Sequence, residues 1–131
     1  MANIKLLIDT DIIIDSLKGI KAARKLFRTK NIEICCSVLS KKELLSKPGL
    51  TSSERKKILE LLSKVRIFRI DTDITSKYSK LIIKYGENSD SIIDYLVAAT
   101  AWSKQLPLLT RNRKHFFHIR EINLAPGYDV E

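Results

Sequence analysis

Cysteine is almost absent from this sequence, which has only Cys35 and Cys36 among its 131 residues. Adjacent cysteines are poorly placed to pair with each other, and the chain has no CxxC spacing that would hold zinc. The sequence therefore argues against a disulfide scaffold and against a structural zinc site. Two reduced thiols are typical of a cytoplasmic protein, which is the location we expect.

Long apolar runs are also missing. The apolar start of the chain is interrupted by Asp9 and Asp11, which argues against a signal peptide. No uncharged stretch approaches the roughly 18 residues that a membrane span needs, so we expect no membrane partner. Internal repeats and low-complexity tracts are lacking as well. The length predicts a single domain over residues 1–131, large enough to bury about two-thirds of its unfolded surface.

Acidic residues are few for the number of basic ones. Lysine and arginine total 24 against 15 aspartates and glutamates, which gives a net charge of +9 and a pI near 9.7. Such an excess favours a polyanionic partner. Nucleic acid fits better than a membrane surface, because no basic amphipathic helix with large lipid-facing aromatic residues stands out. Some acids nevertheless lie inside the most apolar segments.

The segment KLLIDTDIIID, residues 5–15, joins an apolar run to a group of acids. The residues LLI at 6–8 predict a strand buried on both faces, because the run is continuous and too short for a buried helix. Asp9 ends this strand, at the position where parallel α/β sheets bind ligands. A helix is expected from Asp11 to Leu17. Asp9 and Asp11 are therefore either functional acids or simply caps of this helix, and Asp11 is a favoured N-cap residue.

Alternating strands and helices are predicted along the rest of the chain. Further strands are expected at residues 32–37, 65–70 and 107–110, with an edge strand at 122–126, and helices at 20–29, 38–47, 52–64, 71–85 and 90–104. Strands separated by helical segments predict a parallel sheet with helices on both faces.

The segment DSIIDYLVAATAW, residues 90–102, predicts the most apolar helix. Asp90 and Asp94 are four residues apart and therefore share one helix face. Small residues continue that face and would carry Asp94 inward, where a charged carboxylate needs a cation or several hydrogen bonds. The alternatives are a helix N-cap for Asp90 and a capping or solvent-facing role for Asp94.

Glu43 lies in VLSKKELLSK, at the border of the apolar face of a predicted helix. From the pattern alone, it is better explained as a surface residue paired with Lys47, one helical turn later.

The segment TRNRKHF follows the last predicted strand before the tail. Thr110 and Asn112 offer neutral oxygens, whereas Arg111, Arg113 and Lys114 offer positive charge to phosphate groups. A basic surface loop is the alternative interpretation.

His115 and His118 lie beside Phe116 and Phe117. Histidines can serve as general acids or metal ligands, but two histidines among aromatic residues are more typical of packing or of stacking on RNA bases.

Four segments, in this order, resemble the PIN-domain ribonucleases. They are LLIDTDIIID, LSKKELL, DYLVAATA and LLTRNRKHF. The resemblance covers about residues 4–126, and the chain length is similar to that of the VapC toxins of prokaryotic toxin–antitoxin pairs. It implies a PIN-like three-layer α/β/α domain with a central, mostly parallel sheet of four to five strands.

The resemblance also implies a metal site. The family's metal-binding acids correspond to Asp9, Glu43 and Asp94, which would be both the catalytic and the metal-binding residues. Oxygen ligands without histidine or cysteine select Mg²⁺ or Mn²⁺. Asn112 stands where many members have a further acid, so Asp11 or Asp90 would supply the missing charge, or one ion would suffice.

We therefore expect a Mg²⁺- or Mn²⁺-dependent endoribonuclease that acts as the toxin of a VapBC-type pair. RNA would be bound through Thr10, Thr110, Arg111, Arg113 and Lys114. The resemblance implies a homodimer and a small VapB-type antitoxin that covers the acidic groove. The alternatives are a housekeeping RNA-processing nuclease, a DNA-directed PIN nuclease, and a non-catalytic RNA-binding module whose site has decayed.

Overall fold

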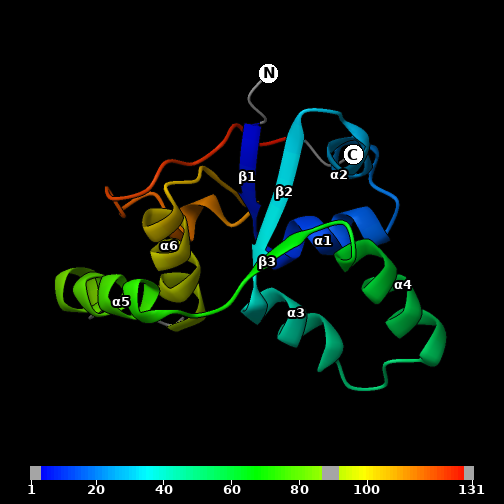
Figure 1. Cartoon of the computed structure of the whole chain (residues 1–131), viewed down its shortest axis with the longest axis horizontal. Helices are drawn as coiled ribbons and strands as arrows, with labels where there is room; N and C mark the ends of the chain where they lie inside the picture. The colour runs from blue at the N-terminus through cyan, green and yellow to red at the C-terminus, as the bar shows by residue number, and fades with distance from the viewer. Residues whose placement is uncertain (1–3, 87–91, 129–131) are drawn as a thin grey trace.

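The computed structural model describes residues 4–86 and 92–128 (Figure 1). In this part of the chain, four parallel strands form one sheet in the order β3-β2-β1-β4. The strands are β1 (Ile4–Ile8), β2 (Ile32–Ser37), β3 (Arg66–Phe68) and β4 (Leu108–Leu109). The helices are α1 (Thr10–Leu17), α2 (Lys21–Arg28), α3 (Val38–Leu45), α4 (Ser52–Leu62), α5 (Thr72–Tyr85) and α6 (Ile92–Lys104), and a 3₁₀ turn, η2 (Arg113–His115), follows β4.

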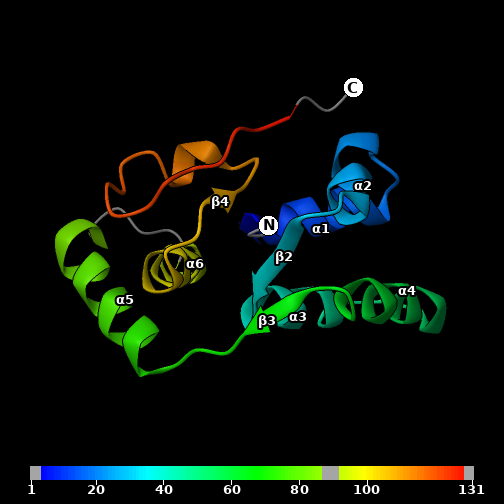
Figure 2. The ribbon, with the colours of Figure 1, turned by 45° about the horizontal axis from the view of Figure 1, so that its top comes forward.

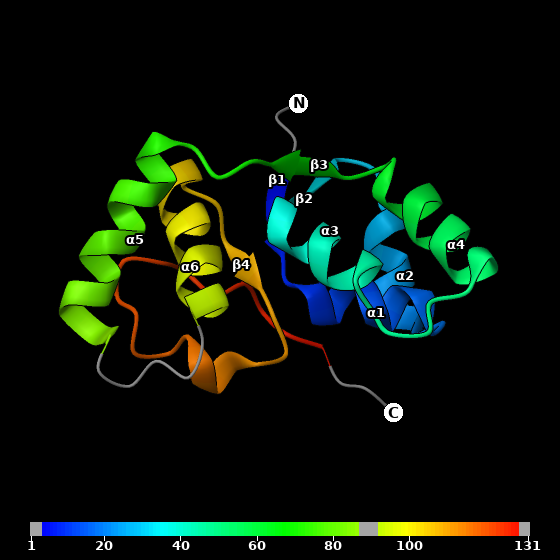
Figure 3. The same cartoon turned by 90° about the horizontal axis from the view of Figure 1, so that it is seen from below.

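Helices cover both faces of the sheet. Figure 3 shows α5 and α6 on one side and α1 to α4 on the other. Alternate residues of β1 separate the two cores: Leu7 packs with the α5 and α6 side, and Leu6 and Ile8 pack with the α1 and α4 side. All three are at most 7% exposed, which confirms the predicted strand buried on both faces and the three-layer α/β/α fold.

Strand register places Asp9 and Thr110, two of the predicted site residues, at the same edge of the sheet. Ile8 pairs with Leu109, so the residues that follow, Asp9 and Thr110, leave the sheet side by side. The Asp9 N–H donates to the Leu109 carbonyl oxygen at 3.0 Å, which keeps Asp9 in the sheet although its strand has ended.

The helix after β1 begins at Thr10, and its N-cap is Asp9 in an extended conformation. The interpretation of Asp11 as the cap is therefore wrong: Asp11 lies inside the first turn. Sheet pairing explains the difference, because the hydrogen bond to β4 fixes where the extended backbone ends.

Two other boundaries differ from expectation. The edge strand predicted at residues 122–126 is reduced to a single parallel bridge between Leu124 and Leu108. The strand predicted at 65–70 shortens to β3, because its partner strand β2 ends at Ser37, which pairs with Phe68. Asp90, the first residue of a predicted helix, lies outside the described residues.

Small side chains line the buried face of α6, where Ala98, Ala99 and Thr100 are each 0% exposed. None of the helices in the described ranges is both long and apolar enough to cross a membrane.

Two leucines of α4 test the packing of this layer. Leu62 is 4% exposed and Leu59 is 39% exposed. Leu62→Ala should lower the free energy of unfolding by about 2–5 kcal/mol, because it leaves a cavity in the core. The matched change Leu59→Ala should cost about 1 kcal/mol or less, since most surface substitutions have small effects. Urea denaturation measures both values, and equal losses would contradict the described packing of α4.

Candidate active site

Asp9 is a buried carboxylate at the carboxyl end of the sheet. It is 9% exposed, accepts a hydrogen bond from the Thr10 N–H at 2.8 Å, and accepts another from the Thr110 hydroxyl at 2.9 Å. Burial raises the pKa of Asp9 from 3.8 to about 6, with further contributions from the charges of Asp11 and Asp94. The two hydrogen bonds lower the pKa but do not offset burial. Charge on Asp9 is therefore costly in this fold.

Asp11 completes the acidic end of β1. Its Oδ2 accepts the Arg111 N–H at 2.8 Å, whereas its Oδ1 is buried and has no hydrogen-bond partner among the described residues. Burial is also the largest cause of the raised pKa of Asp11. A buried oxygen without a donor is rare in folded proteins and marks a place that a donor or a cation would stabilise.

Thr110 orients the Asp9 carboxylate. The Asn112 N–H donates to Oγ1 of Thr110 at 3.0 Å, which leaves the hydroxyl proton for Asp9. Asp11 lies farther from the same hydroxyl, at 3.4 Å. A hydroxyl has one proton to donate, so the shorter contact to Asp9 is the stronger bond.

Glu43 approaches the site from α3, which follows β2 directly and is capped by Ser37. The Thr10 hydroxyl lies 3.2 Å from Oε1 of Glu43 and 2.9 Å from Oγ of the buried Ser40. Partial burial of its carboxyl group raises the pKa of Glu43, and the charge of Asp94 adds to this effect. The structure therefore turns Glu43 toward the end of β1.

Glu43 is exposed, as the surface interpretation expects, but its predicted pairing with Lys47 is wrong. Lys47, the expected partner, forms its ion pair with Glu54 at 3.2 Å instead.

Asp94 lies in the first turn of α6, and its Oδ2 is 2.7 Å from Nδ1 of His115. Its charge contributes to the raised pKa values of both Asp9 and Glu43. The structure thus brings the three predicted carboxylates into one electrostatic environment, although they come from residues far apart in the sequence.

Each of these carboxylates has its own hydrogen-bond partner. Asp9 contacts Thr110, Glu43 contacts Thr10, and Asp94 contacts His115. Within residues 4–86 and 92–128, no group of three Asp, Glu, His or Cys side chains is arranged so that it could hold a metal ion as it stands.

Arg111 is anchored beside the site by a buried acid that the sequence reasoning missed. Its Nε lies 2.9 Å from Oδ2 of Asp15, which is 2% exposed. The Tyr128 hydroxyl donates to the same oxygen at 2.8 Å. The spacing of Asp11 and Asp15, one helical turn apart, is the only sequence signal that pointed to Asp15.

The remaining cations of the basic turn differ in their contacts. Arg113 donates through Nη1 to the Ala125 carbonyl oxygen at 2.8 Å, and its guanidinium lies over the exposed ring of Phe117. Lys114 is exposed. Asn112 is also exposed and contributes its backbone, through the N–H bond to Thr110.

The two histidines have different environments. His118 packs edge-on against the rings of Tyr85 and Tyr95, and its Nε2 lies 2.9 Å from the Tyr95 hydroxyl oxygen. The packing role predicted for His118 is confirmed. His115 instead contacts a candidate metal ligand, Asp94.

A partly enclosed groove of about 520 Å³ begins at Thr10 and Glu43 and runs between α1, α3 and α4. Its walls are mainly apolar, and they include Ile14, Leu17, Leu44, Leu50 and Ile58. The groove thus begins beside the end of β1, at Thr10 and Glu43, and has the mainly apolar lining that is typical of binding grooves.

The chain is similar to known proteins over most of its length. Residues 6–122 match the protein-family model described as PIN domain. The chain is 32% identical over 115 residues to Ribonuclease VapC10 of Mycobacterium tuberculosis, with 85% of each chain covered. It is 36% identical over 115 residues to Ribonuclease VapC19 of the same organism, with 84% of this chain and 90% of the relative covered.

Solved structures have the same fold. The crystal structure of VapBC2 from Rickettsia felis, bound to a DNA fragment from its promoter, superposes with a TM-score of 0.84 at 23% identity, covering 96% of this chain and 100% of the other. A toxin–antitoxin complex from Klebsiella pneumoniae gives a TM-score of 0.75 at 25% identity, covering 94% and 99%. With a family match over residues 6–122 and curated relatives above 30% identity, this chain belongs to the PIN-domain family.

Proposed function

We propose that this protein is a Mg²⁺- or Mn²⁺-dependent endoribonuclease and the toxin of a VapBC-type pair. The curated relatives are named ribonucleases, and the similar solved structures include complexes described as toxin–antitoxin pairs. The observation that carries the proposal is that Asp9 and Glu43 both contact Thr10, while the charge of Asp94 contributes to the raised pKa values of both acids.

The residues at this site fit a divalent cation. Asp9, Glu43 and Asp94 would hold the ion, and the buried Oδ1 of Asp11, which lacks a donor, offers a fourth oxygen. Asp90 and Asn112 are further candidates from the sequence. A hard ion with oxygen ligands, when bound, would acidify a water molecule and stabilise negative charge on the scissile phosphate.

The protein's own groups have separate tasks in this proposal. Thr110 holds the Asp9 carboxylate by its hydrogen bond, and Thr10 does the same for Glu43. Glu43 is the most exposed of the three acids and would orient the attacking water and accept its proton.

RNA is expected to approach from the basic turn. Arg111 is fixed by Asp15 and Lys114 is exposed, so these two would contact phosphate groups beside the site. Thr10, Thr110 and Arg113, which were also expected to contact RNA, already have internal partners, so in this proposal their contribution is mainly to position their neighbours.

The groove that begins at Thr10 and Glu43 is where we place the VapB-type antitoxin. A segment with apolar side chains would fill the channel between α1, α3 and α4, and a basic side chain at its end would reach the carboxylates. Such a segment would neutralise the acids and block RNA at the same time. The expected homodimer stays a prediction.

Asn112 favours one alternative, a non-catalytic RNA-binding module. It stands where many members of the family have an acid, and the described residues form no preassembled metal cage. Cleavage assays separate this alternative from the nuclease proposal, because an RNA-binding module has no use for a divalent ion.

The first prediction concerns cleavage. Purified protein should cut a pool of tRNA and rRNA in Mg²⁺ or Mn²⁺ but not in EDTA. Asp94→Asn should lower the rate at least about 100-fold while leaving the fold intact, because a neutral amide is a poor ligand for a hard cation. The matched control is Asp73→Asn, an exposed acid of α5 that should keep wild-type activity.

Two results would contradict this prediction. An active Asp94→Asn variant would remove Asp94 from the site, and wild-type protein that binds RNA without cutting it in either metal would favour the binding module.

The second prediction concerns stability in the absence of divalent metal. The folded protein binds a proton on Asp9 more tightly than the unfolded chain, so the free energy of unfolding should fall as the pH rises from 3.8 to about 6. Asp9→Asn should remove the part of this dependence that Asp9 causes and add about 3 kcal/mol of stability at pH 7. Asparagine caps helices as well as aspartate does, so α1 should be preserved.

Thermal unfolding at several pH values measures this effect. Mn²⁺ should raise the Tm of the wild type much more than the Tm of Asp9→Asn. A variant that is less stable than the wild type at pH 7 would show that Asp9 is not a destabilising charge.

The third prediction concerns growth. Induced expression of the wild-type chain in a bacterial host without an antitoxin should arrest growth, and expression of Asp94→Asn to the same protein level should not. Culture density and immunoblots provide the measurement. Unaffected growth with active wild-type nuclease would favour a housekeeping enzyme over a toxin.

A further inference from the structure

Helix α2 presents an exposed row of cations. Its sequence, KAARKLFR, has eight residues, four of them basic and none acidic. All four basic residues are exposed, while Ala23 is fully buried against the rest of the molecule. The spacing of three, four and seven residues places the cations along one side of the helix, and we call them the α2 cations: Lys21, Arg24, Lys25 and Arg28.

The α2 cations are arranged unfavourably for the helix itself. Lys21 and Lys25 are one turn apart, as are Arg24 and Arg28, and like charges at this spacing repel each other. Lys21 also lies at the first position, where the helix dipole disfavours positive charge. Among the described residues, no carboxylate pairs with any of the α2 cations. A local conflict without internal compensation points to a use outside the fold.

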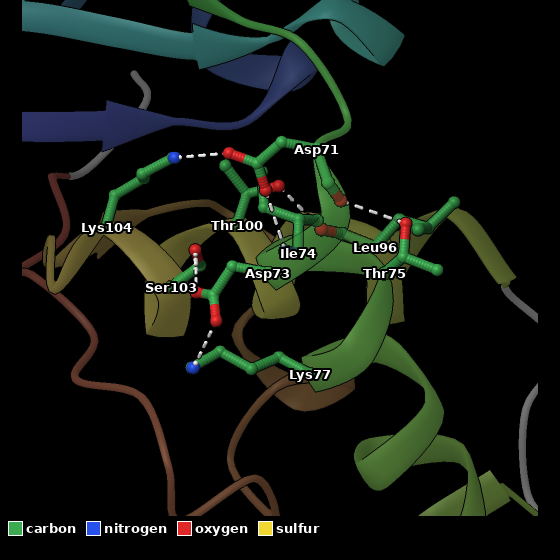
Figure 4. A network of polar contacts seen from close by, with 9 residues as sticks. All are labelled: Asp71, Asp73, Ile74, Thr75, Lys77, Leu96, Thr100, Ser103 and Lys104. Carbon is green, nitrogen blue, oxygen red and sulfur yellow. Dashed lines mark hydrogen bonds and ion pairs between the residues drawn. The ribbon is translucent and has the colours of Figure 1, made fainter.

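On α5 and α6, at the opposite end of the molecule, most cations form ion pairs with acids. On α5 and α6, Lys77 pairs with Asp73 at 3.0 Å and Lys104 pairs with Asp71 at 2.7 Å (Figure 4). The α5 residue Lys84 likewise pairs with Glu121 at 2.9 Å. The positive charges of α5 and α6 are thus largely neutralised within the protein, whereas those of α2 are not.

Arg24 is held in place at the start of the row. Its Nε donates to the Ser16 carbonyl oxygen at 3.2 Å, and its guanidinium lies over Gly19. Gly19 has a φ of +88°, which lets the chain turn sharply from α1 into α2. The rest of the guanidinium is left to act as a preorganised donor for a phosphate.

Surface hollows connect the α2 cations with the candidate active site. Arg24 and Arg28 line a shallow hollow beside α2 and also a second one between α2 and α4. Leu17 and Lys57 line this second hollow and the groove that begins at Glu43. Figure 2 shows α2 next to α1 and on the same side of the molecule as α4, away from α5.

We infer that the α2 cations are a docking surface for the phosphate backbone of RNA, remote from the cut site. The inference rests on the proposed function, for which it names the surface that supplies affinity. The proposed RNA substrate needs such a surface, because the basic turn beside the active site supplies only part of the attraction: Asp15 neutralises Arg111, and Arg113 is bonded to the Ala125 carbonyl oxygen. Within residues 4–86 and 92–128, the side chains of the α2 cations make no ion pair, and Arg24 makes one hydrogen bond, to the Ser16 carbonyl oxygen.

The test uses a variant with Lys21→Gln, Lys25→Gln and Arg28→Gln. Its matched control is Arg69→Gln, Lys80→Gln and Arg120→Gln, which removes the same number of exposed charges from the part of the molecule around α5. Binding of fluorescent single-stranded RNA oligonucleotides of increasing length is measured in EDTA at several salt concentrations. The α2 variant should fold at least as well as the wild type, because the substitutions remove repulsion between neighbouring turns.

The α2 variant should bind long oligonucleotides at least about tenfold more weakly than the control does. The slope of log affinity against log salt should fall by about 2, since each lost phosphate contact on a single strand contributes about 0.7. Short oligonucleotides should be affected less. Equal losses in the α2 variant and the control would overturn the inference, as would wild-type protein that binds none of these RNAs.

The outcome is independent of catalysis. Wild-type protein that binds RNA through α2 but cuts nothing in Mn²⁺ would support the docking surface and contradict the nuclease proposal. Protein that cuts RNA while the α2 variant binds like the control would do the reverse.

Discussion

Burial of carboxylates at the carboxyl end of β1, with a smaller contribution from repulsion between them, is the constraint on which the site depends. Parallel pairing of β1 with β4 fixes where Asp9 leaves the sheet, and α3 and α6 bring Glu43 and Asp94 into the same field. Hydrogen bonds from Thr10 and Thr110 offset only part of the cost of burying Asp9 as an anion. The fold thus keeps a destabilised group at its sheet edge, as sites that bind a cation do. Stability and function oppose each other at this edge.

The surroundings of the acids restrict how they can move. The Asn112 backbone N–H fixes the hydroxyl orientation of Thr110, which in turn holds Asp9. These bonds are made by backbone and hydroxyl groups of the turn that follows β4 directly. Asn112 stands where the resemblance implies an acid. The hydrogen bond to Thr110 does not depend on this side chain, because any residue except proline provides the same backbone N–H.

Sequence reasoning predicted the features that arise from local pattern. The apolar run at 6–8, the alternation of strands and helices, and the acid ending β1 follow from periodicity and burial, and the structure has all of them. Contacts that join distant segments were missed. Asp15 and Tyr128 are 113 positions apart, and Ser40 meets Thr10 only because α3 packs against α1. The cap at Asp9 was also beyond local pattern, since two neighbouring aspartates are equally good caps and only the pairing with Leu109 decides between them.

In the proposed function, the residues that would attract RNA differ from the residues that would cut it. An acidic edge repels a polyanion until a cation neutralises it, so the residues that would perform the chemistry cannot also supply the attraction. The basic turn after β4 supplies only part of it, since Asp15 neutralises Arg111 and Arg113 is bonded to the Ala125 carbonyl oxygen. Within the described residues the α2 cations form no ion pair, although Glu60 lines a hollow together with Arg24 and Arg28. Under the proposal, these cations would attract RNA whether or not the metal is bound. Under this division, loss of the divalent ion would stop cleavage while leaving much of the affinity for RNA.

An antitoxin segment in the apolar groove would then occupy the space between the acidic site and the α2 cations, rather than either of these regions alone.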